Sequence, residues 1–455
     1  MPLLLLGTLG CYVWARELAG LPAARVACWL YALSPSVLGW GPTALTDVAA
    51  AGVWIWTARA VLRFWQNPGR ATAIQAGLWA GATNLVTFTG VLWLLALFAV
   101  GVVKLLLTAV TTQRVLYVRR AAGFFGAVAV AVAVINAGWL FDRTGFRLGE
   151  LRARSSLLLG RPNPHGRLQE NRFAATAFGG IRVPLPMPYL QGLDWYLHNW
   201  ETGYPTYLLG RSLEQSPWYF LPVVLAFKLT PAELCLGASS IVAMIVGLFG
   251  ARAARSRACA LFLTLLPCLA LSFLIASGKM GFYSQWLPGF PFLLLAGIFA
   301  LAPLRRFGWI AAALVGAQAL SALATLGHWH AYTNIFTAGR LPAAYVGPAN
   351  LMPNRVTDYL YLARWVQDLE SHPEVYIANS ALIDLELTTR WKQTADWKDS
   401  SELWFVYDVA NFIAGLDRRE ADVVAVIGGT LYVVRRRTQL VEKPVAAHSA
   451  QAPRR

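Results

Sequence analysis

The feature that most limits how this chain can fold is a series of long apolar segments separated by short loops that carry arginine. A segment of about 20 mostly apolar residues is long enough to cross a lipid bilayer as a helix. With 57% apolar and 14% charged residues, the chain has the composition of a polytopic membrane protein. The sequence predicts spanning helices near 2–15, 23–40, 46–64, 72–86, 88–108, 121–140, 232–250, 258–277, 284–303 and 307–327.

The formal charge of +16 does not indicate nucleic-acid binding, because the arginines lie mostly in the loops on one side of this alternation. An excess of Lys and Arg is typical of the cytoplasmic loops of membrane proteins. The side with the arginine-bearing loops is therefore predicted to be the cytoplasm. On the opposite, external side of the membrane we expect Asp47, the segment 141–231, Lys279 and the residues after about 328. We expect membrane lipids, and no nucleic acid, as partners.

The five cysteines lie in or beside apolar segments and lack the spacing of metal ligands, so they are predicted to be packing residues. The chain begins inside an apolar segment, without a preceding basic stretch and without a cleavage motif. Two explanations stay open for this beginning. The N-terminus lies outside, or a further helix and loop precede the segment.

The predicted fold class is a mainly α-helical membrane protein with a small outward-facing α/β domain at its C-terminal end. N-terminal membrane helices occupy 1–140, and C-terminal membrane helices occupy 232–327. Between them lies an outer loop region, 141–231, with a turn at 162–166. The outward α/β domain spans 328–437, with a helix over 355–370 and strands near 375–383, 403–409 and 423–434. The polar tail, 438–455, is predicted to be disordered.

Within the outer loop region, the stretch 184–231 interleaves tryptophan and tyrosine with proline and glycine. Lys228 lies near its end, beside an apolar run. Amphipathic rings of this kind lie at the depth of lipid headgroups, where a lysine reaches phosphate. The stretch is therefore predicted to lie at the membrane surface.

Five motifs carry a family resemblance by their order along the chain. They are LSPSVLGWGPTALTDVAAA around Asp47, PYLQGLDWYLHNWETGYPTYLLG, SPWYFLPVVLAFKLTP, SGKMGFYSQWLPGFPFLLLAG from Ser277, and HWHAYTNIF from His328. In this order the chain resembles the polytopic GT-C superfamily glycosyltransferases, in their dolichyl-phosphate-mannose-protein mannosyltransferase-like branch. The resemblance implies a GT-C-like helical bundle in the bacterial inner membrane. It also implies transfer of a sugar from a polyprenyl-phosphate donor to a lipid, glycan or protein acceptor at the outer face.

The resemblance gives roles to individual residues. Asp47 corresponds to a carboxylate that takes the acceptor's proton or positions the acceptor, although it also suits a helix N-cap. Lys228, Lys279 and Arg211 are candidates for binding the lipid phosphate. Their ordinary alternatives are interfacial anchors for the lysines and a solvated loop residue for the arginine.

Asp194 and Glu201 flank the aromatic stretch and are candidates for the acceptor site, with solvated loop carboxylates as the alternative. His328 and His330 form an H-x-H pair without a third ligand in the sequence nearby, so no metal site is predicted there. The cofactor prediction is none, with a divalent cation left open.

Two departures from the family pattern keep other functions open. The family's first outer loop, with its main acidic residue, has no counterpart in this sequence, and the segment near Asn84 lacks the family's lysine. A non-catalytic GT-C-like binding or assembly subunit is therefore the first alternative. A transporter is the second, although the apolar segments show neither carboxylate pairs nor broken-helix repeats.

Overall fold

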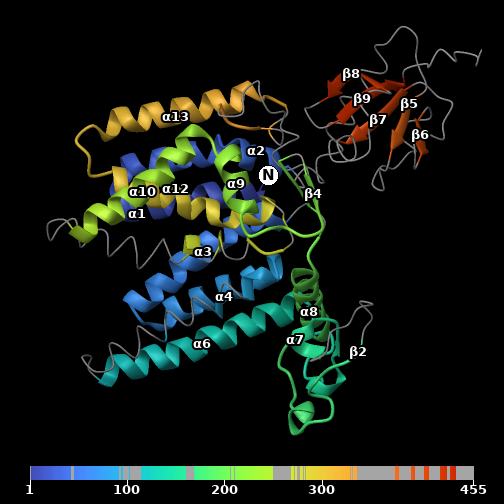
Figure 1. Cartoon of the computed structure of the whole chain (residues 1–455). Helices are drawn as coiled ribbons and strands as arrows, with labels where there is room; N and C mark the ends of the chain where they lie inside the picture. Colours follow the sequence, from blue (N-terminus) through green and yellow to red (C-terminus); the bar gives the residue numbers. More distant parts are fainter. Residues whose placement is uncertain are drawn as a thin grey trace, which may run out of the picture. The chain divides into compact units, whose positions relative to one another are not determined.

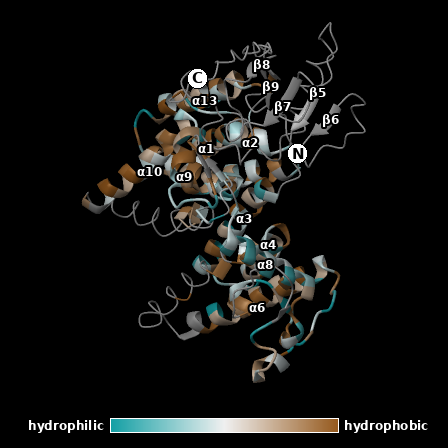
Figure 2. Ribbon diagram, turned by 45° about the vertical axis from the view of Figure 1, so that its right-hand side comes forward, coloured by the Kyte–Doolittle hydropathy of each residue, from teal (hydrophilic) through white to brown (hydrophobic). Residues whose placement is uncertain are grey.

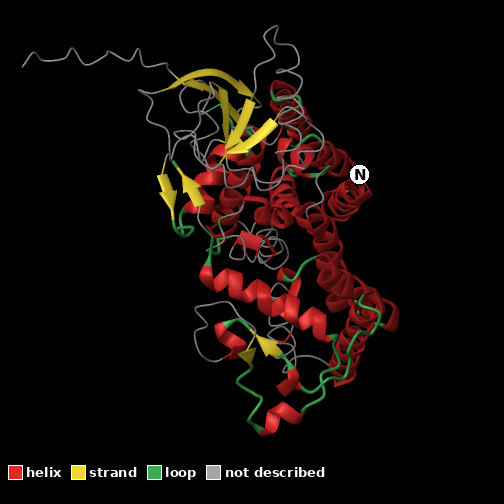
Figure 3. Cartoon of the chain, turned by 90° about the vertical axis from the view of Figure 1, so that its right-hand side faces the viewer, coloured by secondary structure: helices red, strands yellow, loops and turns green. Residues whose placement is uncertain are grey.

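The computed structural model divides into two compact units, Met1–Arg355 and Val356–Arg455. The first is mainly helical, and the second contains a small sheet (Figures 1 and 3). The residues that the structure describes are 2–42, 46–91, 94–95, 102, 114–159, 169–204, 206–209, 211–249, 268–270, 272–273, 277–279, 281, 283–327, 329, 332–335, 375–378, 391–394, 404–408, 421–427 and 431–436.

The chain begins with a helical hairpin. The segment α1 (Pro2–Ala32) is interrupted at Gly20, which has φ 86° and ψ −176°. This backbone conformation is essentially restricted to glycine, because a Cβ atom would clash with the backbone. Tyr31 packs directly on Gly7, so the two halves fold back against each other. The short helix α2 (Pro35–Trp40) follows.

Three helices form the next layer: α3 (Thr46–Gln66), α4 (Arg70–Val86) and α6 (Arg114–Gly138). Thr57 of α3 hydrogen-bonds the Thr83 hydroxyl at 2.8 Å and the Trp79 carbonyl at 3.0 Å, which joins α3 to α4. Gly77 and Gly81 lie against α6, where any larger side chain would collide with its backbone or valines. Small residues of this kind let membrane helices approach closely.

Four further helices of the first unit surround a buried centre. They are α10 (Pro231–Phe249), the 3₁₀ helix η3 (Tyr283–Gly289), α12 (Phe290–Leu301) and α13 (Phe307–Ala324). Most of α12 is buried against α1 and α10, with Phe292 in edge contact with Trp14. In Figure 2, brown stretches of hydrophobic residues recur along α6, α10 and α13.

The structure confirms a mainly helical membrane protein. Among the described residues, three helical segments are long and apolar enough to span a bilayer: Val118–Gly138, Tyr283–Leu301 and Phe307–Ala324. The predicted helix 23–40 is wrong as one element, because the chain leaves the helix at Leu33 and restarts at Pro35. Proline cannot donate the helical hydrogen bond there, and it disfavours helical geometry at the residue before it. Most of the predicted segments 88–108 and 258–277 lies outside the described residues.

The region 141–231, which the sequence predicts to be an outer loop region, is built around α8 (Met187–Thr202). Before it come the short elements η1 (Leu148–Glu150), β1 (Arg152–Ala153), α7 (Ser156–Leu159), β2 (Gln169–Glu170) and η2 (Ala177–Gly180). After it come the hairpin β3 (Thr206–Leu208) and β4 (Arg211–Leu213), then α9 (Phe220–Lys228). The turn predicted at 162–166 lies outside the described part of the chain.

The second unit holds a five-stranded sheet in the order β6-β5-β7-β9-β8. Its strands are β5 (Val375–Ala378), β6 (Trp391–Thr394), β7 (Trp404–Asp408), β8 (Ala421–Ile427) and β9 (Leu431–Arg436). β5 pairs in parallel with β6 and β7, and β9 runs antiparallel to β7 and β8. The single strand predicted over 423–434 is therefore two antiparallel strands. The predicted helix over 355–370 lies outside the described residues.

Candidate functional site

Asp47 lies in the first turn of α3, where the positive end of the helix dipole favours a carboxylate. The hydroxyl of Ser284, in η3, donates a hydrogen bond to this carboxylate. Tyr196 of α8 lies close enough to interact electrostatically with Asp47, and its pKa is raised by burial and by that negative charge. Three segments far apart in the sequence thus meet at Asp47, which is more than a helix N-cap requires.

The chain segment before η3 is held on the end of α8. The Lys279 carbonyl accepts hydrogen bonds from the backbone N–H groups of Tyr204 at 3.4 Å and Ser216 at 3.3 Å. The exposed Lys279 ammonium donates to the Glu201 carbonyl at 3.2 Å. The phosphate candidate Lys279 therefore lies at the end of the helix that carries Tyr196.

The two carboxylates predicted for the acceptor site accept hydrogen bonds from the preceding loop. Asp194 is 1% exposed and accepts hydrogen bonds from the Arg154 N–H at 2.6 Å, the Ser155 N–H at 3.0 Å and the Ser155 hydroxyl at 2.5 Å. Glu201 accepts from the Ser156 N–H at 2.8 Å and the Leu157 N–H at 3.4 Å. These contacts fix the segment from β1 to α7 along α8.

Lys228 ends α9 and is 5% exposed. Burial lowers its pKa to about 8, because the charged ammonium is disfavoured away from water. Next to it, the Asn334 amide donates to the carbonyls of Ala226 at 2.6 Å and Leu229 at 3.0 Å, which closes the end of the helix. A snorkelling lysine keeps its charged head in water, so this buried position differs from an interfacial anchor.

The structure describes less of the three other candidate residues, Arg211, His328 and His330. Arg211 begins β4 opposite Leu208, and its side chain lies outside the described part of the structure. His328 and His330 both lie outside it as well. Among the described residues, no group of three or more histidine, cysteine or acidic side chains is arranged to hold a metal ion.

A buried carboxylate that the sequence analysis did not single out is Glu233, in the first turn of α10 and fully buried. It accepts hydrogen bonds from the Ser34 hydroxyl at 2.8 Å, the Gln318 amide at 2.6 Å and the Thr230 N–H at 2.9 Å. The Thr230 hydroxyl binds Gln318 at 2.5 Å and accepts the Glu233 N–H at 3.2 Å. The network joins Ser34, at the N-terminus of α2, to α10 and α13. Its sequence signal was available, because Thr-x-x-Glu is a capping box.

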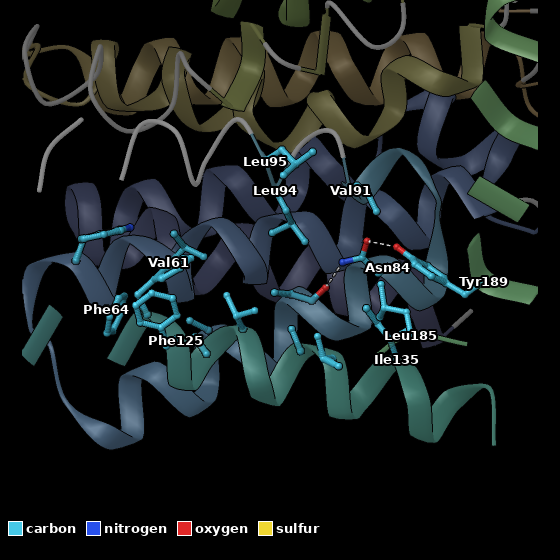
Figure 4. A pocket seen from close by; sticks show the side chains of 18 residues that line it. Val61, Phe64, Asn84, Val91, Leu94, Leu95, Phe125, Ile135, Leu185 and Tyr189 are labelled. Carbon is cyan, nitrogen blue, oxygen red and sulfur yellow. Dashed lines mark hydrogen bonds between the residues drawn. The ribbon is translucent and has the colours of Figure 1, made fainter. Parts of the chain in front are cut away.

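An apolar groove of about 460 Å³ lies among α3, α4, α6 and the start of α8 (Figure 4). Apart from Trp65, Asn84 and Tyr189, every side chain that lines it is aliphatic or phenyl. Val61, Phe64 and Phe125 lie at one end. At the other end the Tyr189 hydroxyl donates to the Asn84 amide oxygen at 2.9 Å. The groove is thus long, apolar and marked by a polar pair at one end.

The polar end of the groove lies toward Asp47. The Thr57–Thr83 contact shows that Asn84 of α4 packs near the middle of α3, and Asp47 lies ten residues, or about 15 Å, before Thr57. Tyr189 and Tyr196 are seven residues apart on α8, which places them on the same helix face about 10 Å apart. One face of α8 therefore borders both the groove and the surroundings of Asp47.

A solved structure similar to this chain is the crystal structure of ArnT from Cupriavidus metallidurans bound to undecaprenyl phosphate. The two share 15% sequence identity with a TM-score of 0.42, over 96% of this chain and 83% of that chain. No protein-family model and no curated protein matches the sequence. At this level of likeness, the function has to be argued from the chain's own residues.

Proposed function

We propose that the chain is a membrane glycosyltransferase of the GT-C kind that moves a sugar from a polyprenyl-phosphate donor to a lipid, glycan or protein acceptor. The observation that carries the proposal is the continuity along α8. Tyr189 closes an apolar groove, and Tyr196, on the same helix face, adjoins the Asp47 carboxylate. A donor with a long apolar chain and a sugar at its phosphate end needs these two environments next to each other.

In the proposed reaction, an acceptor hydroxyl oxygen attacks the anomeric carbon of the sugar. The bond from that carbon to the phosphate oxygen breaks, and polyprenyl phosphate leaves with the electron pair. Asp47 takes the acceptor proton, a role that contributes about 10²–10⁴ in rate where a side chain is well positioned. Lys279, Lys228 and Arg211 are the cations proposed to stabilise the phosphate.

The proposed location is the bacterial inner membrane, with the Asp47 end of α3 outside. Support comes from the arginine-bearing loops, because Arg63 and Arg70 lie at the opposite end of the α3–α4 pair. The finer assignment to the dolichyl-phosphate-mannose-protein mannosyltransferase-like branch, and so to the cell envelope, rests on the order of the sequence motifs. A divalent cation at the phosphate stays a proposal of the same kind.

The test uses the full chain in lipid nanodiscs with undecaprenyl phosphate carrying mannose, glucose or a pentose. Release of undecaprenyl phosphate is followed in the presence of membrane lipid and glycan extracts. We expect Asp47→Asn to lower turnover by about 10²–10⁴ while undecaprenyl phosphate still binds. The matched control is Asp142→Asn, at an exposed loop carboxylate, which should leave turnover unchanged.

Equal turnover in wild type and Asp47→Asn would remove Asp47 from the mechanism. A wild-type protein that binds the lipid but turns over none of the three donors would support the non-catalytic binding or assembly subunit. A protein that binds no polyprenyl phosphate would refute both the glycosyltransferase and the binding or assembly subunit. The transporter would then be the remaining alternative.

A further inference from the structure

Within the part of the chain that the structure describes, several buried polar atoms have no hydrogen-bond partner, and three of them lie close together in the sequence around the end of α8. These three belong to a larger set of such atoms and are taken together because all lie on α8 or just after it: the Tyr196 hydroxyl, the Asn199 amide nitrogen and the Thr206 hydroxyl. Asn199 is 9% exposed and Thr206 is 3% exposed. Leaving such a group unsatisfied costs about 1–3 kcal/mol, so it calls for an explanation in each case. Here one explanation, a bound ligand, serves all three.

Tyr196 interacts with Asp47, and the other two groups are linked to that position through α8 and the segment before η3. Tyr196 and Asn199 are three residues apart on α8 and therefore share a helix face. Burial and the charge of Asp47 raise the pKa of Tyr196, which keeps its hydroxyl protonated and able to donate. Thr206 packs on Gly281, where an added Cβ atom would lie 2.9 Å from the Thr206 hydroxyl oxygen. Gly281 is three residues before Ser284, the hydrogen-bond donor to Asp47.

The chemistry of this trio distinguishes between possible ligands. A phenol, an amide and an aliphatic hydroxyl are neutral, whereas phosphate is recognised through cations and charge-assisted hydrogen bonds. Neutral donors and acceptors suit the hydroxyl groups of a sugar, since each hydroxyl can both donate and accept. A site built to bond hydroxyl groups also discriminates strongly between ligands that differ in one of them.

We infer that Tyr196, Asn199 and Thr206 form a subsite that binds the hydroxyl groups of the transferred sugar beside Asp47. The inference rests on the proposed function and deepens it, because it identifies the residues that select the sugar. Lys279, at the end of α8, lies next to this subsite and remains the candidate for the phosphate.

Two variants each remove one unpartnered oxygen with little change of shape: Tyr196→Phe and Thr206→Val. We expect each to weaken binding of the sugar-bearing lipid about three- to tenfold, the value of one neutral hydrogen bond. Binding of undecaprenyl phosphate without sugar should not change. The melting temperature should stay constant or rise, because an unsatisfied buried oxygen has been removed. The control is Ser240→Ala, whose buried hydroxyl already donates to the Gly237 carbonyl at 2.7 Å.

Binding is measured in nanodiscs for undecaprenyl phosphate alone and for its mannosyl, glucosyl and pentosyl forms, so no turnover is needed. For each sugar, the ratio of the dissociation constant of undecaprenyl phosphate to that of the sugar-bearing lipid reports how much the sugar contributes to binding. If wild type binds the bare lipid but no sugar-bearing form more tightly, or if both variants keep the wild-type ratio, the subsite is refuted while the lipid-binding part of the proposed function stands. A fall in melting temperature without change in that ratio also refutes it. Failure of wild type to bind any of the lipids refutes both proposals.

Discussion

Replacing Glu233 with alanine should destabilise the protein more than any surface substitution. The carboxylate is fully buried and accepts hydrogen bonds from Ser34, Gln318 and Thr230. Alanine leaves these three donors in the interior without that acceptor. A stranded buried donor costs about 1–3 kcal/mol, and such losses within one network are not additive, so we expect a total of roughly 3–5 kcal/mol.

The free energy of unfolding can be measured by titrating the detergent-solubilised protein with a denaturing detergent and following tryptophan fluorescence. The control is Glu214→Ala, at an exposed carboxylate, which should change it by less than about 0.5 kcal/mol. Glu233→Gln should fall between the two, because one oxygen remains while its new amide N–H groups face other donors.

A double variant sharpens the test. If the Ser34 hydroxyl acts through Glu233, Ser34→Ala should cost less in the Glu233→Ala background than in wild type, by about 1 kcal/mol. A Glu233→Ala protein destabilised by less than about 1 kcal/mol would show that the carboxylate is not a structural acceptor, and the reasoning from its contacts would be refuted.

Three further predictions concern single positions. Gly20→Ala should destabilise by about 1–3 kcal/mol, measured in the same unfolding titration, because alanine disfavours φ 86° and little else is near the site. Asp194→Ala should release the loop that Asp194 holds, and limited trypsin digestion should then cut after Arg154 about tenfold faster or more. Lys228 binds its proton more weakly in the folded protein, with a pKa of about 8 against 10.5, so stability should rise between these pH values, by roughly 3 kcal/mol in full. The rise should be absent in Lys228→Met, and an equal rise in both proteins would contradict the assignment.

Much of the helical architecture could be predicted from the sequence, because apolar periodicity and segment length report directly on local structure. The helices that contain Asp47 and Asn84 are where the pattern places them, within a few residues. The break after Ala32 and the two strands in place of one were missed, although both had local signals. Pro35 marks the first, and the dipeptide Gly428-Gly429 is typical of a hairpin turn.

The candidate site was less accessible to such reasoning, because it depends on which segments meet. Nothing local to Ser284 shows that it donates to Asp47, since the two are joined only by the packing of η3 against α3. Likewise, Asp194 has the sequence surroundings of a loop carboxylate but is buried under backbone N–H groups from a different segment. For Glu233, the Thr-x-x-Glu pattern is local, but nothing local shows that Ser34 and Gln318 meet this carboxylate.

The α8 helix has a consequence for the length of any molecule bound along it. A helix of 16 residues is stiff, so the separation of about 10 Å between Tyr189 and Tyr196 is fixed. A short-chain analogue would reach either Tyr189, at the apolar groove, or Tyr196, beside Asp47, but not both together. In a series of ligands of increasing length, the affinity for the protein should therefore increase in a step, rather than gradually, at the length that spans both tyrosines.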